Sequence, residues 1–112
     1  MALREIDHNT FVSEQITINQ LADFAEAGIK SIICNRPDHE SPDQPSFSQI
    51  KAVTDTLGID AYYIPVSPQN ITQDDIDHMR SVLQKCKKPL LAYCRSGSRS
   101  IHLYNLAKAI DA

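Results

Sequence analysis

The sequence predicts an α/β domain built on a parallel β-sheet, and three observations lead to this fold class. Four short apolar runs alternate with four helical patterns along the chain, as in a sheet whose strands are joined by crossover helices. The last three runs are almost continuously apolar, which is typical of strands buried on both faces. Polar start signals and glycine stop signals flank the helical patterns. The expected strands cover residues 10–12, 31–34, 61–66 and 90–94.

The expected helices are bounded by residues that suit helix ends. Thr17 and Ser46 each precede a glutamine by three positions, as in a capping box. Two acidic residues follow Thr72, where the helix dipole favours negative charge in a first turn. The stop signals are Gly28, Gly58 and Pro89. The fourth helix, about 99–110, has apolar residues on more than one face, so we expect it to be deeply buried or to contact a partner.

Length and composition indicate one domain over residues 1–112. The chain has 112 residues, 42% of them apolar, which is enough for a single core. No apolar run is long enough to cross a bilayer, so no membrane association is expected. The net charge of −3 comes with no long basic stripe, which argues against a nucleic-acid partner. The oligomeric state is left open.

The N-terminus and the cysteines favour a cytoplasmic location. The first eight residues carry charges where a signal peptide needs its apolar stretch. Three cysteines without a Cys-x-x-Cys pair argue against a disulfide framework and suit a reducing compartment. We expect Cys34 and Cys86 to be inert core residues, which leaves Cys94 as the thiol free to react.

Cys94 ends the most apolar strand and is followed by a short polar loop, Cys94-Arg95-Ser96-Gly97-Ser98-Arg99-Ser100. In an open parallel sheet, ligands bind beyond the carboxyl ends of the strands. The loop must turn sharply into a helix, so successive N–H groups can converge on one anion while the helix N-terminus adds partial positive charge. The pattern therefore predicts a thiolate with a lowered pKa, ready to act as a nucleophile.

Each residue type in this loop suits that chemistry. Gly97 permits a positive φ, Arg99 offers a planar fork of donors to an anion, and the Ser100 hydroxyl can reach the sulfur. Arg95 is expected to point outward and guide an anionic substrate, with Ser96 and Ser98 in the cradle. The alternative interpretation is a buried strand cysteine followed by a polar turn with two solvated arginines.

Further candidates lie beyond the second strand, in and before a proline-rich loop at 37–45. Arg36 and Asp38 could line the same cleft, although they could equally pair with each other on the surface. The loop itself is a plausible rim for a site. We predict no metal and no cofactor, because the four histidines show no metal-ligand spacing. They are His8, His39, His78 and His102.

At these residues the chain resembles the phosphatase-like domain family of beta-lactamase hydrolase-like proteins. The matching segments cover nearly the whole chain. They are VSEQI (12–16), SIICNRPD (31–38), QPSF (44–47), YIPV (63–66) and AYCRSGSRS (92–100). The resemblance implies the three-layer fold of cysteine-dependent and dual-specificity phosphatases, with a four-stranded parallel sheet flanked by helices. In some family members such a domain precedes a metallo-β-lactamase-like persulfide dioxygenase, so a separate partner of that kind is conceivable.

Two departures from the phosphatase pattern favour sulfur chemistry. Phosphatases of this architecture place five residues between Cys and Arg, whereas four separate Cys94 from Arg99. The shorter loop resembles that of rhodaneses, which stabilise a cysteine persulfide. Ser67 also stands where a dual-specificity phosphatase keeps its general-acid Asp. Asp74 and Asp75 are expected to be first-turn helix residues, and thiol leaving groups need an acid less than alkoxides do.

The sequence therefore predicts a sulfurtransferase. The Cys94 thiolate would take sulfur from a small anionic donor, thiosulfate or a low-molecular-weight persulfide, and pass it to a thiol acceptor. Arg99 and the loop amides would hold the anionic sulfur. The first alternative is hydrolysis of phosphate monoesters through a Cys94 phosphoenzyme. The second is a non-catalytic module that binds anions or persulfides and regulates a partner.

Overall fold

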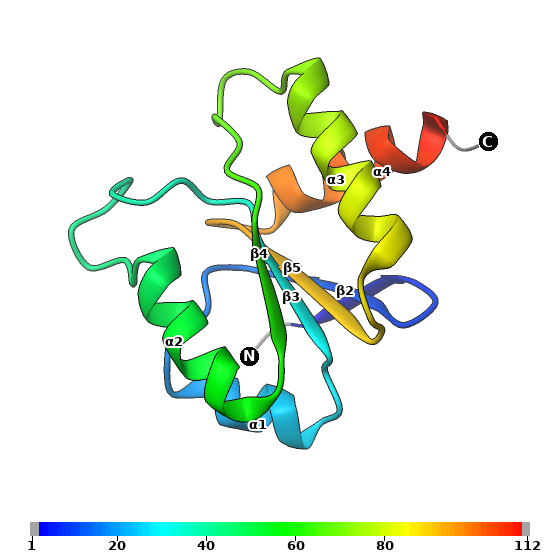
Figure 1. Cartoon of the computed structure of the whole chain (residues 1–112). Helices are drawn as coiled ribbons and strands as arrows, with labels where there is room; N and C mark the ends of the chain where they lie inside the picture. Colours follow the sequence, from blue (N-terminus) through cyan, green and yellow to red (C-terminus); the bar gives the residue numbers. More distant parts are fainter. Residues whose placement is uncertain (1–2, 111–112) are drawn as a thin grey trace.

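The computed structural model describes residues 3–110, which form a five-stranded sheet between two pairs of helices (Figure 1). The strand order is β1-β2-β5-β3-β4. The strands are β1 (Arg4–Asp7), β2 (Thr10–Ser13), β3 (Ser31–Cys34), β4 (Asp60–Tyr63) and β5 (Leu90–Tyr93). The helices are α1 (Gln20–Glu26), α2 (Phe47–Leu57), α3 (Gln73–Lys85) and α4 (Ser98–Ile110).

The four expected strands form the parallel part of the sheet, which confirms the predicted fold class. β5 lies at the centre, where Leu90 is opposite Thr10 on one side and Ser31 on the other. All four residues of β5 are buried, in agreement with its continuous apolar sequence. Beyond β4, the Ile64 N–H still donates to the Cys34 carbonyl at 2.9 Å. This explains why the apolar run extends past the end of that strand.

The prediction of four parallel strands was wrong in one respect. A fifth strand, β1, pairs antiparallel with β2 and makes the sheet mixed. Three of its four residues are exposed, so it has no continuous apolar run by which it could be recognised. It forms a hairpin with β2 through a turn in which Asn9 has a φ of 52°. An exposed edge strand of this kind is defined by its pairing rather than by burial.

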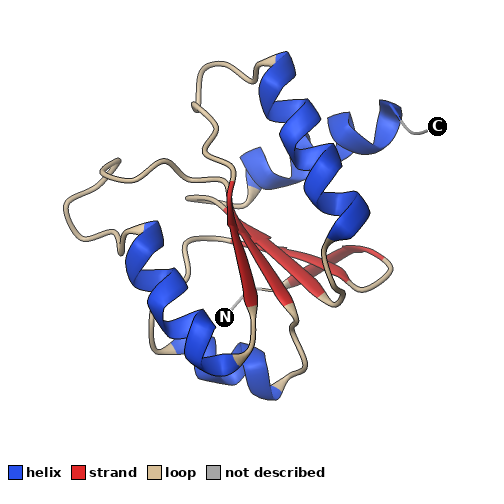
Figure 2. Cartoon of the chain, in the orientation of Figure 1, coloured by secondary structure: helices blue, strands red, loops and turns tan. Residues whose placement is uncertain are grey.

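Two layers of helices cover the sheet (Figure 2). α1 and α2 contact each other on one face, and α3 and α4 contact each other on the other face. The start signals at Ser46 and Thr72 are confirmed, since both residues form complete capping boxes. Thr17 and Gln20 also make the reciprocal bonds of a capping box, although α1 itself begins at Gln20.

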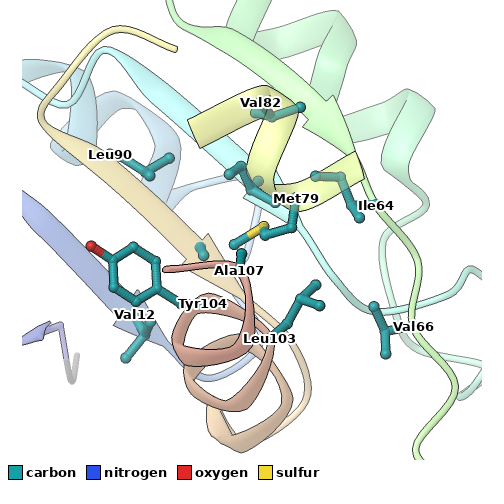
Figure 3. Packing of buried hydrophobic residues seen from close by; sticks show 11 residues of the cluster. Val12, Ile64, Val66, Met79, Val82, Leu90, Leu103, Tyr104 and Ala107 are labelled. Carbon is teal, nitrogen blue, oxygen red and sulfur yellow. The ribbon is translucent and has the colours of Figure 1, made fainter. Parts of the chain in front are cut away.

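Helix α4 buries one face, while its apolar residues on other faces, Ile101 and Leu106, are half-buried. The buried residues are Ser100, Leu103, Tyr104 and Ala107. Figure 3 shows Leu103, Tyr104 and Ala107 of α4 packed beside Met79 of α3 and Val12 of β2. The Tyr104 hydroxyl also donates a hydrogen bond of 2.5 Å to the Asp7 carboxylate, which ties α4 to the edge hairpin. Of the two expectations for this helix, burial therefore holds for one face, and contact with a partner stays a prediction. No helix within residues 3–110 is both long and apolar enough to span a bilayer.

Candidate active site

Three chain segments meet at the carboxyl ends of the parallel strands. Cys94 and its loop follow β5, residues 35–45 follow β3, and residues 64–68 follow β4. The Gln15 N–H donates to the Arg95 carbonyl at 3.1 Å, so the segment after β2 also holds the loop. The sheet thus brings the predicted nucleophile to the edge where an α/β fold binds ligands.

The Cys94 thiol lies inside the loop that follows it. The Gly97 N–H donates a hydrogen bond to Sγ at 3.1 Å. Burial by itself raises the pKa of Cys94, but backbone N–H groups of Ser100, Gly97, Ser96 and Arg99 oppose this, and the net result is a lowered pKa. Converging amide dipoles stabilise the thiolate more than the loss of water destabilises it. The predicted activated thiol is therefore supported by the loop geometry.

The thiol that we predicted to be free to react is enclosed in this structure. Cys94 has 0% of its surface exposed. The physical reason is the tightness of the loop, whose amides point at the sulfur itself. The sulfur is thus enclosed from solvent in this conformation.

Gly97 adopts the left-handed conformation that the tight turn requires, with a φ of +98°. Space alone would admit a side chain, since a Cβ at this position would lie 3.5 Å from the Ser13 carbonyl oxygen. The need for glycine is thus conformational, because L residues are strained at this φ. The expectation of a positive φ at Gly97 is confirmed.

Ser100 acts differently from the expectation. Its backbone N–H faces the sulfur, while its hydroxyl donates to the Asn35 Oδ1 atom at 2.8 Å. Asn35 Nδ2 in turn donates to the Ile64 carbonyl at 3.0 Å. Ser100 and Asn35 are both 0% exposed. Their buried hydrogen bonds connect the loop after β5 to the segments that follow β3 and β4.

A carboxylate that the sequence did not single out, Glu40, holds two arginines of the site. Arg99 donates to its two oxygens at 2.8 and 2.9 Å, and Arg36 Nε donates to Oε1 at 3.0 Å. The hydrogen bond from Arg99, then the hydrogen bond from Arg36 and the charges of both guanidinium groups, lower the pKa of Glu40 against the effect of burial. Arg99 also donates to the Val66 carbonyl at 2.9 Å. Its guanidinium is therefore fixed from two sides.

Asp38 does not line the cleft, and that expectation was wrong. Its Oδ1 accepts the Phe47 N–H at 2.8 Å, and its own N–H donates to the Tyr63 hydroxyl at 2.9 Å. These bonds join the 37–45 loop to α2 and β4, so its role is structural. The alternative pairing of Asp38 with Arg36 is not observed either, because Arg36 binds Glu40 and Gln15.

A cavity of about 430 Å³ lies over the loop. It is lined by Arg36, Glu40, Pro68, Arg95, Ser96, Ser98 and Arg99. The prediction that Arg36, Arg95, Ser96, Ser98 and Arg99 share one cleft is supported by this lining. Glu40 comes from the 37–45 loop, which is consistent with the expected rim. Three guanidinium groups against one carboxylate make the cavity suitable for an anion.

A general acid is missing from the cavity lining. Ser67 lies exposed in a turn with Asn70, and Asp74 and Asp75 occupy the first turn of α3 as expected. Glu40 is the carboxylate of the lining, but its lowered pKa keeps it ionised and unable to donate a proton near neutral pH. Among residues 3–110, no three His, Cys, Asp or Glu side chains are grouped as metal ligands.

The other two cysteines differ in burial, since Cys34 is in the core whereas Cys86 is half-buried at the edge of the core. Burial raises the pKa of Cys34 to about 11 and also raises the pKa of Cys86. Cys34 donates from its thiol to the Arg36 carbonyl at 3.3 Å. Both predictions of inert cysteines are consistent with these environments.

The family of the chain can now be stated from sequence comparison. The sequence model of the phosphatase-like domain of beta-lactamase hydrolase-like proteins matches residues 2–111. The chain belongs to this family. A curated relative, the beta-lactamase hydrolase-like protein of Agrobacterium fabrum, is 38% identical over 106 residues. The match covers 89% of this chain but 25% of that relative, so the chain spans about a quarter of its length.

Solved structures agree with this membership. A crystal structure from Neisseria meningitidis Z2491, provisionally named a phosphatase, is 35% identical with a TM-score of 0.89. The match covers 100% of this chain and 80% of that one. The core catalytic domain of the PP-IP phosphatase Siw14 from S. cerevisiae has a TM-score of 0.65 at 18% identity, over 85% of this chain and 56% of that one. At that identity the likeness concerns the fold, which is that of cysteine phosphatases.

Proposed function

We propose that this domain hydrolyses phosphate monoesters with acidic leaving groups, such as phenols, through a phosphocysteine at Cys94. The observation that carries the proposal is a thiol whose pKa is lowered by four loop N–H groups beneath an arginine-lined cavity. The family and the cysteine-phosphatase fold support this reaction better than the sulfur transfer that the sequence favoured. The proposal therefore reverses the order of the first two hypotheses.

The reaction has two steps. The Cys94 thiolate attacks phosphorus, an S–P bond forms, and the P–O bond to the leaving group breaks with its electron pair on oxygen. Water then attacks the phosphocysteine, releasing inorganic phosphate and restoring the thiolate. The loop amides and the Arg99 guanidinium, which also interacts with the Cys94 sulfur, would neutralise the phosphoryl oxygens in the cavity.

The leaving group follows from the absence of an acid in the cavity lining. An alkoxide departs slowly without protonation, whereas a phenolate, from a phenol of pKa about 10 or lower, departs more readily. Ser67 offers no replacement acid at neutral pH. We therefore expect aryl phosphates to be hydrolysed faster than alkyl phosphates.

The test is hydrolysis of p-nitrophenyl phosphate beside an alkyl phosphate, with intact mass used to detect the phosphocysteine. The expected result is turnover of the aryl ester, with a gain of one phosphoryl group on the wild type and none on Cys94→Ser. Turnover that persists in Cys94→Ser would contradict the proposal. So would the absence of both turnover and the covalent intermediate.

Sulfur transfer is the second candidate, and the small size of the loop favours it. The amide hydrogens converge on Sγ of Cys94, where they would also surround the outer sulfur of a persulfide. The thiolate would attack the outer sulfur of thiosulfate and expel sulfite, and an acceptor thiolate would then remove that sulfur. In this case a metallo-β-lactamase-like persulfide dioxygenase is a candidate partner. Faster turnover of thiosulfate or glutathione persulfide than of p-nitrophenyl phosphate would favour this candidate.

A further inference from the structure

The three arginines that line the cavity over Cys94 differ in how their charges are matched. Arg99 and Arg36 share the carboxylate of Glu40, through contacts of 2.8 to 3.0 Å. Arg36 also donates from Nη1 to the side-chain oxygen of Gln15 at 3.0 Å. These two guanidinium groups are thus oriented, and partly neutralised, before any substrate binds.

Arg95 is the exception. Its residue is exposed, and within residues 3–110 its side chain forms no hydrogen bond or ion pair with another residue. Its backbone is nevertheless fixed, since its carbonyl accepts the Gln15 N–H at 3.1 Å. Arg95 therefore carries its positive charge on a fixed backbone, directly after Cys94. No carboxylate of the described residues pairs with this guanidinium.

Arg95 also stands between two cavities. Beside the cavity over Cys94 lies a second one of about 350 Å³, and both are lined by Arg36 and Arg95. The remaining lining of the second cavity is largely polar and includes Gln15, Thr17, Ser41 and Gln44. It also includes one carboxylate, Asp43, which accepts a hydrogen bond from the Ser41 hydroxyl and interacts with the charge of Arg36. A substrate whose reacting group lies over Cys94 can therefore extend past Arg95 into this second space.

We infer that the preferred substrate carries a second anionic group, a carboxylate or phosphate, which Arg95 binds at the junction of the two cavities. Arg99, held by Glu40 and Val66, would contact the reacting group, whereas Arg95 would contact the other end of the molecule. A planar guanidinium without a partner matches a carboxylate or phosphate by two parallel hydrogen bonds. This inference rests on the proposed anion site over Cys94 and assigns a specificity-determining role to Arg95.

The test measures binding separately from turnover. Calorimetry compares para-(phosphonomethyl)phenylacetate with its neutral N-methylamide, which share the phosphonate and differ in the second charge. We expect the carboxylate to bind wild type about 10-fold more tightly, as a charged hydrogen bond allows, and Arg95→Gln to reduce this ratio to about one. Lys30→Gln, which removes an exposed positive charge from the segment before β3, is the matched control and should keep the ratio.

The outcomes separate the two proposals. An equal ratio in wild type and Arg95→Gln, a ratio near one in wild type, or no binding of either phosphonate would overturn the inference about Arg95. The corresponding aryl phosphates report on hydrolysis in the same proteins. An affinity ratio that depends on Arg95, without hydrolysis, would uphold the inference about Arg95 and reject the phosphatase reaction. Hydrolysis without a preference for the second charge would support the phosphatase reaction and reject the inference about Arg95.

Discussion

Cys34 and Cys94 lie at the same edge of the sheet, one position apart in the strand register, because Cys34 is opposite Tyr93 and Cys94 follows Tyr93. Their ionisation nevertheless differs. Each lies at the carboxyl end of a central parallel strand, and their exposed fractions are 2% and 0%. Burial raises the pKa of Cys34 to about 11. Burial acts on Cys94 too, but the loop N–H groups outweigh it and lower its pKa. The course of the backbone after the strand, rather than the degree of burial, decides whether a thiol becomes a nucleophile.

The largest effect should come from removing each sulfur in turn. Cys94→Ser is expected to lower kcat for p-nitrophenyl phosphate by ~10⁴-fold or more, because the covalent step loses its nucleophile. Cys34→Ser should retain most of the activity, since that thiol lies in the core and bonds to the Arg36 carbonyl. Comparable losses in the two variants, with both proteins folded by circular dichroism, would remove the distinction between the thiols.

The second effect concerns how the two thiols ionise. A thiol is reactive above its pKa, so alkylation of Cys94 should begin at lower pH than for an ordinary cysteine, and the acidic limb of kcat/KM should shift the same way. Cys34 should remain protonated until about pH 11. Because the pKa of Cys94 is lowered and that of Cys34 is raised, Cys94 should carry the larger thiolate fraction at pH 7.

Iodoacetamide labelling over a pH series, followed by peptide mass mapping, measures both thiols in one sample. The raised pKa of Cys34 also means that its contribution to folding stability is retained below the ordinary thiol pKa and is lost as pH rises through about 11. Labelling of Cys94 with an ordinary alkaline midpoint would contradict the loop argument.

The third effect tests the turn at Gly97, which orients the loop N–H groups toward the Cys94 sulfur. Gly97→Ala should cost about 1–2 kcal/mol of unfolding free energy, because φ is +98° at this position. It should also raise the pKa of Cys94 and lower kcat, by roughly 10²-fold if one amide donor is lost. Gly58→Ala is the matched control, since Gly58 has a φ of +73° in a helix cap with open space around it. It should show similar destabilisation with an unchanged thiol.

The smallest effect on catalysis is expected from the network behind the loop. Ser100→Ala leaves the buried Asn35 Oδ1 without its donor, so denaturant unfolding should show a loss of about 1–3 kcal/mol. Activity should fall little, because the backbone N–H of Ser100 stays in place beside the sulfur. Ser81→Ala, at an exposed position of α3, should change stability by less than about 0.5 kcal/mol. Equal stability of the two variants would show that the network contributes little.

Much of the architecture could be predicted because it depends on neighbouring residues. Continuous apolar runs located the four parallel strands, and Ser46, Gly58 and Thr72 located helix ends, since caps act within one turn of backbone. The exposed strand β1 could not be located in this way. Its charged residues follow no core pattern, and its existence depends on pairing with β2.

In the candidate site, too, features formed by neighbouring residues could be predicted and contacts between distant segments could not. By itself, the sequence determined the candidate nucleophile, the glycine turn and the basic loop, because these lie within seven consecutive residues. Tertiary structure alone decided that Glu40 binds an arginine 59 positions away, that Ser100 bonds to Asn35, and that Cys94 is enclosed. Such contacts depend on which loops the sheet brings together, and no local pattern of residues encodes that arrangement.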